Sequence, residues 1–231
     1  MREIVFDTET TGLDNQTDRI IEIGCIELEN QFPTGRSLHL FINPDGRKVH
    51  PDALAVHGIT DAFLADKPVF ADVADEITAF FEGAHYVAHN ATFDMGFLNS
   101  EYRRLGRQPV PTDLVIDTLA LARRRHPMGP NSLDALCRRY GIDNSHRSRH
   151  GALLDAELLT DVYIEMLGGR QAALGLSASD TVQVERRSDD EIVVIGERPN
   201  PLPERLSAAD IQAHAALIDR IGADALWRKP G

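Results

Sequence analysis

Near the start of the chain stands the stretch Ile4-Val5-Phe6-Asp7-Thr8-Glu9-Thr10-Thr11-Gly12. The apolar run that opens it predicts a short strand buried on both faces, with the acidic residues where that strand ends. Because residues i and i+2 of a strand project from the same face, Asp7 and Glu9 place two carboxylates side by side. Such a pair repels itself unless a cation neutralises it, and a hard divalent metal with oxygen ligands meets that need. On these residues alone, a metal site and an ordinary acidic loop are equally open.

The composition is that of a soluble globular protein. The 231 residues are 42% hydrophobic, enough for one large domain or for a domain of about 170 residues with an extension. No apolar stretch approaches the ~18 residues needed to span a membrane, and the first strand begins so early that we expect no signal peptide. Cys25 and Cys137 are isolated and lack metal-ligand spacing, which indicates free thiols in a reducing cytosol and predicts a cytoplasmic protein.

The charge of the chain limits what it can bind unaided. A formal net charge of −12 argues against general electrostatic capture of nucleic acid. If the substrate is a nucleic acid, we therefore expect metal ions at the site and a partner that helps to hold the polymer.

The order of predicted elements indicates the fold class. Strands are expected at 4–6, 20–28, 37–42, 86–89 and 114–117, and helices at 69–81, around 93–98, and at 119–125, 133–140 and 152–167. Gly168-Gly169 supplies a stop for the last of these helices. Three early strands that can pair as a meander, followed by strands alternating with helices, predict an α/β or α+β sheet covered by helices.

Three further motifs accompany the opening stretch. His89-Asn90-Ala91-Thr92-Phe93-Asp94 places a carboxylate near the start of a helix just after a strand, and Val56-His57-Gly58-Ile59-Thr60 predicts a loop. In His150-Gly151-Ala152-Leu153-Leu154-Asp155, the two end residues would point about 140° apart on one helix. They can serve one site only if His150 lies on the incoming loop. The alternative is an exposed loop histidine followed by an aspartate that the helix dipole stabilises.

The character of the chain changes after about Ser177. Residues 177–206 are polar and proline-rich, which predicts a flexible linker, interrupted by a short extended apolar segment at 192–195. Residues 207–231 begin with a capping box at Ser207 and carry an apolar helical stripe of Ile211, Ala215, Ile218 and Ile221. The predicted organisation is a domain over 1–176, a linker over 177–206 and a tail helix over 207–231.

Taken together, the motifs resemble those of the DEDD exonuclease superfamily in its histidine-bearing branch. The resemblance covers about residues 2–170 and includes, in order, Asp7-x-Glu9, His89-Asn90-x-x-Phe93-Asp94 and His150-x4-Asp155. Residues 56–59, 131–137 and 150–156 are similar to the proofreading subunits of bacterial replicative DNA polymerases, and so is the tail at 225–228. The resemblance implies a ribonuclease-H-like fold, with a mixed five-stranded sheet flanked by helices, in a cytoplasmic bacterial protein.

The resemblance also implies a mechanism and its residues. Two divalent ions, Mg²⁺ or Mn²⁺, would lie about 3.5–4 Å apart, with His150 as the general base for a water molecule. The product would be a nucleoside 5′-monophosphate released from a DNA 3′ end. The expected metal ligands are Asp7, Glu9, Asp94 and Asp155. The expected substrate contacts are Asp7, Glu9, Thr10, Val56, His57, Phe93 and Asp155. Stacking by Phe93 and His57 would tolerate any base, although core packing is an equally good interpretation of Phe93.

The implied partners are the polymerase (alpha) subunit and the sliding clamp, and a third small core subunit is left open. Polymerase binding is expected of Ile211, Ile218 and Trp227 in the tail. Clamp binding is expected of Gln171, Leu174 and Leu176, weakly, because Leu176 stands where an aromatic residue is often found; the frayed end of a helix is the alternative. Two rival functions are an RNA-trimming exonuclease of the same superfamily and a binding subunit that has lost its chemistry. The intact set of four carboxylates and His150 argues against the second.

Overall fold

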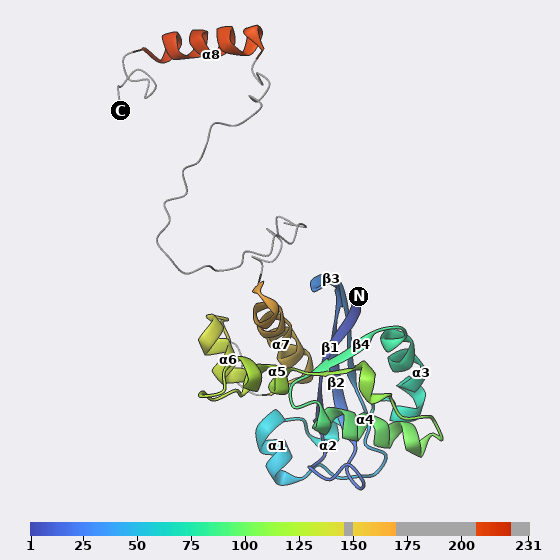
Figure 1. The fold of residues 1–231 in the computed structure, drawn as a ribbon. Helices are drawn as coiled ribbons and strands as arrows, with labels where there is room; N and C mark the ends of the chain where they lie inside the picture. The colour runs from blue at the N-terminus through green and yellow to red at the C-terminus, as the bar shows by residue number, and fades with distance from the viewer. Residues whose placement is uncertain (146–149, 170–206, 223–231) are drawn as a thin grey trace, which may run out of the picture. The chain divides into compact units, whose positions relative to one another are not determined.

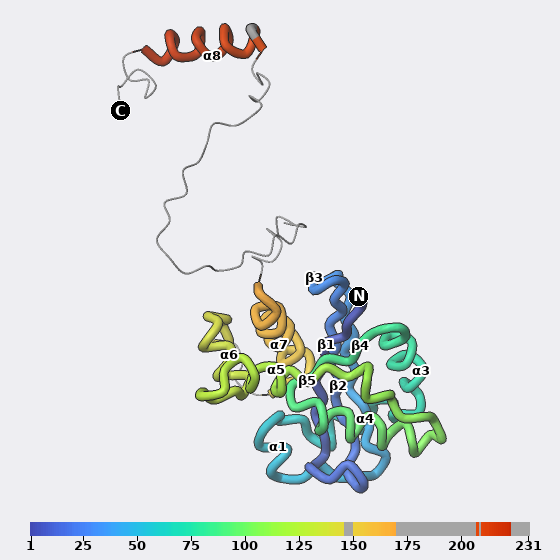
Figure 2. Tube along the Cα trace, viewed as in Figure 1, coloured from blue at the N-terminus to red at the C-terminus, as the bar shows by residue number. Residues whose placement is uncertain are grey.

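The computed structural model describes residues 1–145, 150–169 and 207–222. The chain divides near residue 178 into two units. The first contains the sheet and all the helices except the last, and the second contains α8, as Figures 1 and 2 show. Each unit is considered by itself below.

A five-stranded mixed sheet organises the first unit, as the sequence predicted. The strands are β1 Arg2–Thr10, β2 Ile20–Glu29, β3 Phe32–Phe41, β4 His85–Ala88 and β5 Val115–Asp117, in the spatial order β3-β2-β1-β4-β5. The first three pair antiparallel as the expected meander, whereas β4 and β5 join parallel to β1 and to each other. This order places β1 at the centre of the sheet.

Strand β1 is longer than its apolar run predicted. The expected strand ended at Phe6, but the ladder with β2 continues through Asp7 and Glu9 to Thr10, with an irregularity just before Thr10. Backbone hydrogen bonding to β2 keeps these polar residues in the strand, so pairing overrides the local pattern. The two carboxylates therefore lie within the strand, on one face, and not in the loop that follows it.

Helices cover both faces of the sheet (Figure 1). On one side, Ile4 and Phe6 pack against the apolar residues of α3 and α4. On the other side, Val5 packs against Leu159 and Tyr163 of α7, and α5 and α6 pack on α7 in turn. The bounds are α1 Pro51–His57, α2 Asp61–Leu64, α3 Phe70–Phe81, α4 Thr92–Arg104, the 3₁₀ turn η1 Thr112–Leu114, α5 Thr118–Arg125, α6 Leu133–Tyr140 and α7 Ala152–Leu167.

The segment predicted as a loop around residues 56–60 contains the end of a helix. Helix α1 has Pro51 at its start, is capped by the His50 side chain, and ends at His57 before Gly58, whose φ is 74°. Glycine tolerates this left-handed backbone, which favours it as a helix stop. Helices of seven and four residues, such as α1 and α2, are too short to show a readable 3.6-residue period. The loop prediction was therefore wrong for Val56 and His57.

The second unit is described only over α8, Ala208–Ile221. The predicted capping box is present: the Ser207 hydroxyl accepts from the Asp210 amide at 3.2 Å, and Asp210 accepts from the Ser207 amide at 3.0 Å. Ile211, Leu217 and Ile221 are exposed on this helix. The predicted linker at 177–206, with its extended segment, lies outside the described residues. In the ranges that the structure describes, no helix combines the length and the apolarity needed to cross a membrane.

Candidate active site

The predicted catalytic side chains meet at the carboxyl end of β1. Asp7 and Glu9 come from this strand, Asp94 from the first turn of α4, Asp155 from the first turn of α7, and His150 from the residues just before α7. A cavity of about 290 Å³ is lined by Asp7, Thr8, Glu9, His89, Asn90, Phe93, Asp94, Ser132, Leu133, Asp134, His150 and Asp155. Residues from distant parts of the sequence are thus brought to one place.

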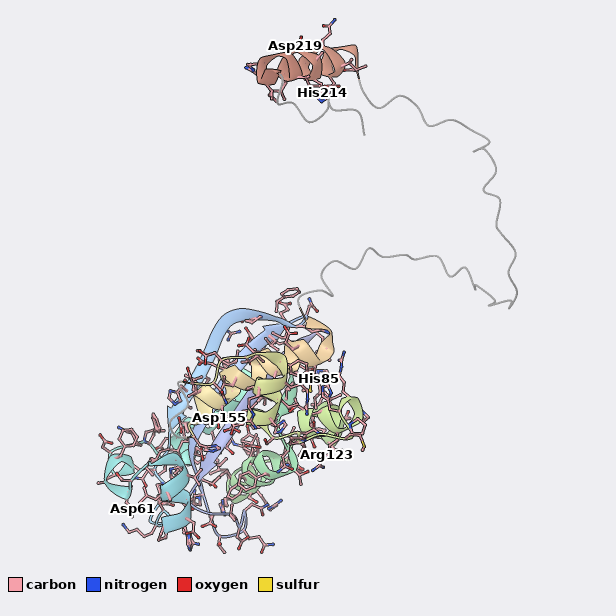
Figure 3. The ribbon with its side chains drawn as sticks, turned by 90° about the vertical axis from the view of Figure 1, so that its left-hand side faces the viewer. Asp61, His85, Arg123, Asp155, His214 and Asp219 are labelled. Carbon is pink, nitrogen blue, oxygen red and sulfur yellow. The ribbon has the colours of Figure 1, made fainter. Side chains whose placement is uncertain are left out.

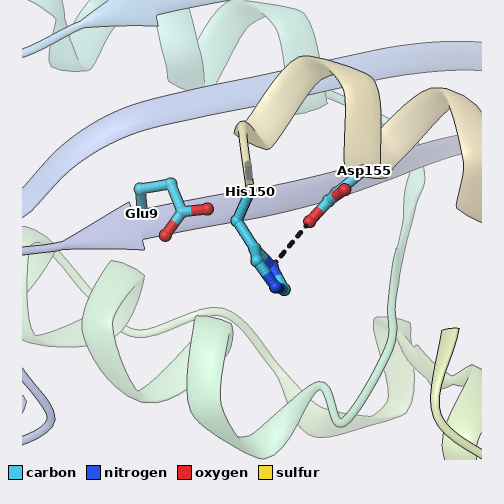
Figure 4. A group of neighbouring side chains, drawn as sticks. All are labelled: Glu9, His150 and Asp155. Carbon is cyan, nitrogen blue, oxygen red and sulfur yellow. Dashed lines mark ion pairs between the residues drawn. The ribbon is translucent and has the colours of Figure 1, made fainter. Parts of the chain in front are cut away.

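Three of these side chains form a cluster of potential metal ligands. One ligand atom from each of Glu9, His150 and Asp155 lies within 4.8 Å of the other two, and Figure 4 shows the three side chains converging. His150 Nδ1 is 3.2 Å from Asp155 Oδ2, with the imidazole about half exposed and the carboxylate buried. As expected from its spacing, His150 lies before α7 and not on it.

Asp94 and Asp155 are the two most deeply buried acids of the site, and the pKa of Asp94 is raised. Asp94 is 3% exposed, and its Oδ1 accepts hydrogen bonds from the Thr8 amide at 3.1 Å and the Thr8 hydroxyl at 2.7 Å. Burial raises the pKa of Asp94 to about 7, even though the hydrogen bonds from Thr8 favour the charged form. A cation beside this carboxylate would favour its ionised form.

The donor set suits a divalent ion. Carboxylate oxygens with one nearby imidazole are the ligands that hard and borderline divalent metals take in proteins. Asp7, Glu9, Asp94 and Asp155 all line the one cavity, and the raised pKa of Asp94 shows the electrostatic cost that a cation would remove. The residues present therefore fit the metal that the sequence predicted.

A glycine of β2 allows α7 to reach this position. Gly24 is the register partner of Asp7, and a Cβ atom built on it would lie 2.2 Å from the backbone nitrogen of Leu153. The first turn of α7 therefore rests directly on the β2 backbone, one strand away from Asp7. This close approach brings Asp155 to the site.

The predicted substrate residues are placed differently from one another. Phe93 lines the cavity and also packs on Phe97, with ring centroids 4.9 Å apart, so it takes part in both the cavity wall and the core. Thr10 is buried, and its hydroxyl donates to the Gly12 carbonyl at 2.6 Å. That hydroxyl holds the turn after β1, and Thr10 does not line the cavity.

Val56 and His57 also lie beside the cavity and not in its wall. The His150 amide donates to the Val56 carbonyl at 3.4 Å, which ties the end of α1 to the approach to α7. Val56 is 46% exposed, whereas His57 is buried. The Nδ1 atom of His57 accepts from the Ile59 amide at 2.9 Å. Burial lowers the pKa of His57, and the nearby His150 lowers it further.

Several cavity residues were not predicted as site residues. His89 is held by Thr118 Oγ1 and by the Asn131 carbonyl, each at 2.9 Å, and so connects the start of α5 and the residues before α6 to the cavity wall. Burial lowers the pKa of His89. Asn90, Ser132 and Asp134 complete this wall. The motif at 89–94 and the N-cap position of Ser132 were visible signals, but a single sequence carries none for Asp134.

Of the predicted partner-binding residues, Ile211 is 57% exposed on α8 and Ile218 is partly buried. Gln171, Leu174, Leu176 and Trp227 lie outside the described residues.

Comparison with known proteins identifies the family of the chain. The family described as Exonuclease matches residues 4–163. DNA polymerase III subunit epsilon of Escherichia coli (strain K12) is 43% identical over 98% of this chain and 97% of its own length. The chain belongs to the exonuclease family, in its DNA polymerase III subunit epsilon group. The epsilon subunit of Rickettsia conorii is 42% identical over 96% of both chains, and that of Haemophilus influenzae is 52% identical over 73% of this chain and 68% of its own.

Solved structures of exonucleases share the fold. Exonuclease X, in complex with 5′ overhanging duplex DNA, is 32% identical, with a TM-score of 0.56 over 72% of this chain and 90% of that chain. Exonuclease I aligns with a TM-score of 0.64 at 20% identity, over 75% of this chain and 42% of its own, which supports the fold alone. The predicted superfamily and its ribonuclease-H-like sheet are confirmed, and the chain is a 3′–5′ exonuclease by family.

Proposed function

We propose that this exonuclease removes nucleotides from DNA 3′ ends as 5′-monophosphates and acts as the proofreading subunit of DNA polymerase III. The observation that carries the proposal is the gathering of Asp7, Glu9, Asp94, Asp155 and His150 around one cavity. Similarity to epsilon subunits over almost the whole chain supports the same assignment. The link to the polymerase comes from those relatives, which are epsilon subunits of DNA polymerase III.

The four carboxylates would hold two divalent ions, Mg²⁺ or Mn²⁺. When bound, such ions supply charge stabilisation at the phosphate oxygens and lower the pKa of a water nucleophile. Without cations, four acidic side chains in one cavity repel each other and the phosphate. Their role is therefore to hold positive charge where the scissile phosphate enters.

We expect His150 to act as the general base. Its Nδ1 atom is 3.2 Å from Asp155 Oδ2, a contact that can orient the imidazole toward the attacking water. The imidazole is about half exposed at the cavity, so that the proton can pass on to solvent. A base in this role typically contributes about 10²–10⁴-fold to the rate.

The tail is proposed to join the exonuclease to the polymerase (alpha) subunit. Helix α8 exposes Ile211, Leu217 and Ile221 on 14 residues, a pattern that suits an amphipathic helix entering an apolar groove. Binding to the sliding clamp through residues 171–176, and to a third small core subunit, stay predictions of the sequence.

The test follows a DNA primer labelled at its 3′ end. Single labelled nucleotides should appear with Mg²⁺ or Mn²⁺ and should disappear when EDTA is added. A matched RNA oligonucleotide, which differs by its 2′-hydroxyls, should be cut more slowly if DNA is the substrate. Release that survives EDTA, or that begins at the 5′ end, would contradict the proposal; faster cutting of RNA would favour the RNA-trimming alternative.

A further inference from the structure

Five arginines gather at the ends of two helices that flank the cavity. Arg123, Arg124 and Arg125 form the last turn of α5, and Arg138 and Arg139 lie in the last turn of α6. All five are exposed. We refer to these five residues as the arginine cluster. It stands out on a chain whose formal net charge is −12.

The cluster differs from most other arginines of the domain because it has no carboxylate partner among the described residues. Arg139 donates to the Asn131 side chain and the Pro130 carbonyl, both uncharged. The arginines that do pair with a carboxylate in the described domain are Arg2, Arg19, Arg36, Arg47, Arg104 and Arg107. Acidic side chains outnumber basic ones 36 to 24, so carboxylate partners are plentiful in the sequence. Within the described ranges, the cluster nevertheless pairs with none of them.

The helix dipole explains only part of the cluster. A cation near a helix C-terminus stabilises the helix only modestly, which accounts for one arginine on each helix. Consecutive helical residues point about 100° apart, so Arg123, Arg124 and Arg125 cannot all reach the carbonyls at the end of α5. At least part of this positive charge is available to a ligand.

The cluster is continuous with the wall of the cavity. Arg139 Nη1 donates to Asn131 Oδ1 at 3.3 Å, and the Asn131 carbonyl contacts His89 Nε2 at 2.9 Å, where His89 lines the cavity. Arg123 is near enough to lower the pKa of His89, although burial is the larger cause. Figure 3 shows Arg123 on α5, which packs against the α7 helix that carries Asp155.

The surface beside the cluster is hollowed. A depression of about 420 Å³ is lined by Leu121, Arg124, Arg125, Met166 and Leu167. Leu121, Met166 and Leu167 are apolar and the two arginines are cationic. This combination suits a nucleic-acid strand, whose phosphates can contact the arginines while its bases lie on the apolar side chains. Arginine binds phosphate through two parallel N–H donors, which gives direction as well as attraction.

We propose that the arginine cluster binds the backbone phosphates of the single-stranded DNA whose 3′ end enters the cavity. This inference rests on the proposed function. It gives the acidic exonuclease a local source of affinity for the substrate, so that the strand is held by α5 and α6 while its last nucleotide meets the carboxylates. Affinity then depends on strand length and on salt, because only nucleotides beyond the cavity reach the cluster.

The test compares two variants of the full-length chain. The cluster variant is Arg123→Gln, Arg124→Gln and Arg125→Gln. The control variant is Arg36→Gln, Lys67→Gln and Arg103→Gln, which removes three positive charges elsewhere on the same domain. Steady-state cleavage is measured on a dinucleotide and on a 12-nucleotide single strand, and equilibrium binding of a fluorescent 12-nucleotide strand is measured in EDTA.

At low salt, the cluster variant should lose about tenfold in kcat/KM on the 12-nucleotide strand, relative to its change on the dinucleotide. The loss should come from a higher KM, with kcat unchanged. The plot of log kcat/KM against log salt should become shallower by about 2, since each phosphate contact on a single strand contributes about 0.7. The control variant should keep the wild-type ratio and slope.

Two results would overturn the inference: an equal effect of both variants, which would assign the effect to overall charge, or a cluster variant that binds the strand as wild type does. The binding measurement separates this failure from the failure of the proposed function. If wild type binds the strand through the cluster but releases no nucleotide, the proposed function is wrong and the surface remains. If wild type cleaves, and the cluster variant has the same ratio of kcat/KM on the two substrates and the same salt dependence, the proposed function stands and the arginine cluster does not bind the strand.

Discussion

At the scale of single residues, burial makes the charge of Asp94 costly when no cation is present. The pKa of Asp94 is raised from 3.8 to about 7, mainly by burial. Between these values the folded protein holds a proton that the unfolded chain releases, so stability falls as pH rises. In EDTA, we therefore expect the free energy of unfolding to drop by a few kcal/mol from about pH 4 to about pH 7 and then to level off, because each pH unit between the two pKa values is worth about 1.4 kcal/mol.

Urea unfolding at a series of pH values in EDTA checks this expectation. Asp94→Asn should remove the decline and should be more stable than wild type above pH 7, whereas Asp113→Asn, at an exposed position of η1, should leave it in place. Saturating Mg²⁺ should flatten the wild-type curve. A wild-type curve that rises over this range would mean that Asp94 is ionised in the metal-free fold.

Substitution of Asp155 tests whether the proposed metal ligands are needed for catalysis. Asp155→Ala removes a carboxylate that is buried beside His150 and within reach of Glu9. Loss of a metal ligand should lower the single-turnover rate by about 10³-fold or more, because metal-bound charge stabilisation is worth several kcal/mol and each 1.36 kcal/mol is tenfold. Asp161→Ala, at an exposed position on the same helix, is the matched control. The metal-free melting temperature should not fall, since like charges repel less; full activity in Asp155→Ala would rule out the proposed ligand set.

His150 should control the pH dependence of the chemical step. If it is the base, the single-turnover rate rises with pH, because only the neutral imidazole can accept the proton of the attacking water. His150→Ala should lower the plateau by about 10²–10⁴-fold and flatten this limb, while metal binding measured by calorimetry largely survives. An unchanged pH profile in the variant would return His150 to the role of an exposed histidine before a helix.

The residues of the site were predictable to different degrees for physical reasons. Asp7 and Glu9 share a strand face, and His150 must precede its helix, so period and spacing predicted both arrangements. The hydroxyl of Thr10 is used within the turn after β1, a local hydrogen bond that no pattern reveals. Asp134 reaches the cavity only through the packing of α6, which is a tertiary contact.

At the scale of elements, the site depends on how closely α7 approaches β2. A Cβ on Gly24 would collide with the backbone of Leu153, and backbone cannot move aside as a side chain can. Gly24→Ala should therefore shift the start of α7 and destabilise the domain by about 1–3 kcal/mol. A misplacement of about 1 Å at Asp155 and His150 should cost about 10²-fold in rate.

Gly151→Ala is the matched control for this effect. It lies at the N-cap of α7, and a Cβ there meets no atom within 4 Å. Chemical denaturation and single-turnover cleavage of both variants should separate them clearly. Equal behaviour of the two would mean that α7 is not positioned by its contact with β2.

Elements with a strong period were predicted well, and short ones were not. Helix α3 was expected over 69–81 and spans Phe70–Phe81, because its apolar side chains recur along one face over three turns. Helices α1 and α2 have too few residues for such a pattern. The extension of β1 through Asp7 to Thr10 follows from the β2 ladder, which is non-local and therefore invisible in the run of residues itself.

At the scale of the whole molecule, the division between chemistry and assembly can be tested by truncation. All five proposed catalytic residues lie before the end of α7, whereas α8 is a separate capped helix with exposed Ile211, Leu217 and Ile221. Exposed apolar side chains on a helix gain stability by entering a groove on a partner, and a linker of the kind predicted for residues 177–206 would raise the effective concentration of the exonuclease near the primer.

A chain ending at residue 176 should therefore release nucleotides from short single strands at the full-length rate but fail to co-elute with the polymerase subunit in size-exclusion chromatography. In the full-length chain, Ile211→Asp with Leu217→Asp should also abolish co-elution, because charged side chains on an apolar face are costly to bury. Gln212→Asp with Asp219→Ala changes the same exposed helix at polar positions and should preserve the complex. Co-elution of the truncated chain would place the polymerase contact on the exonuclease domain instead, and lost cleavage would show that the domain needs its tail.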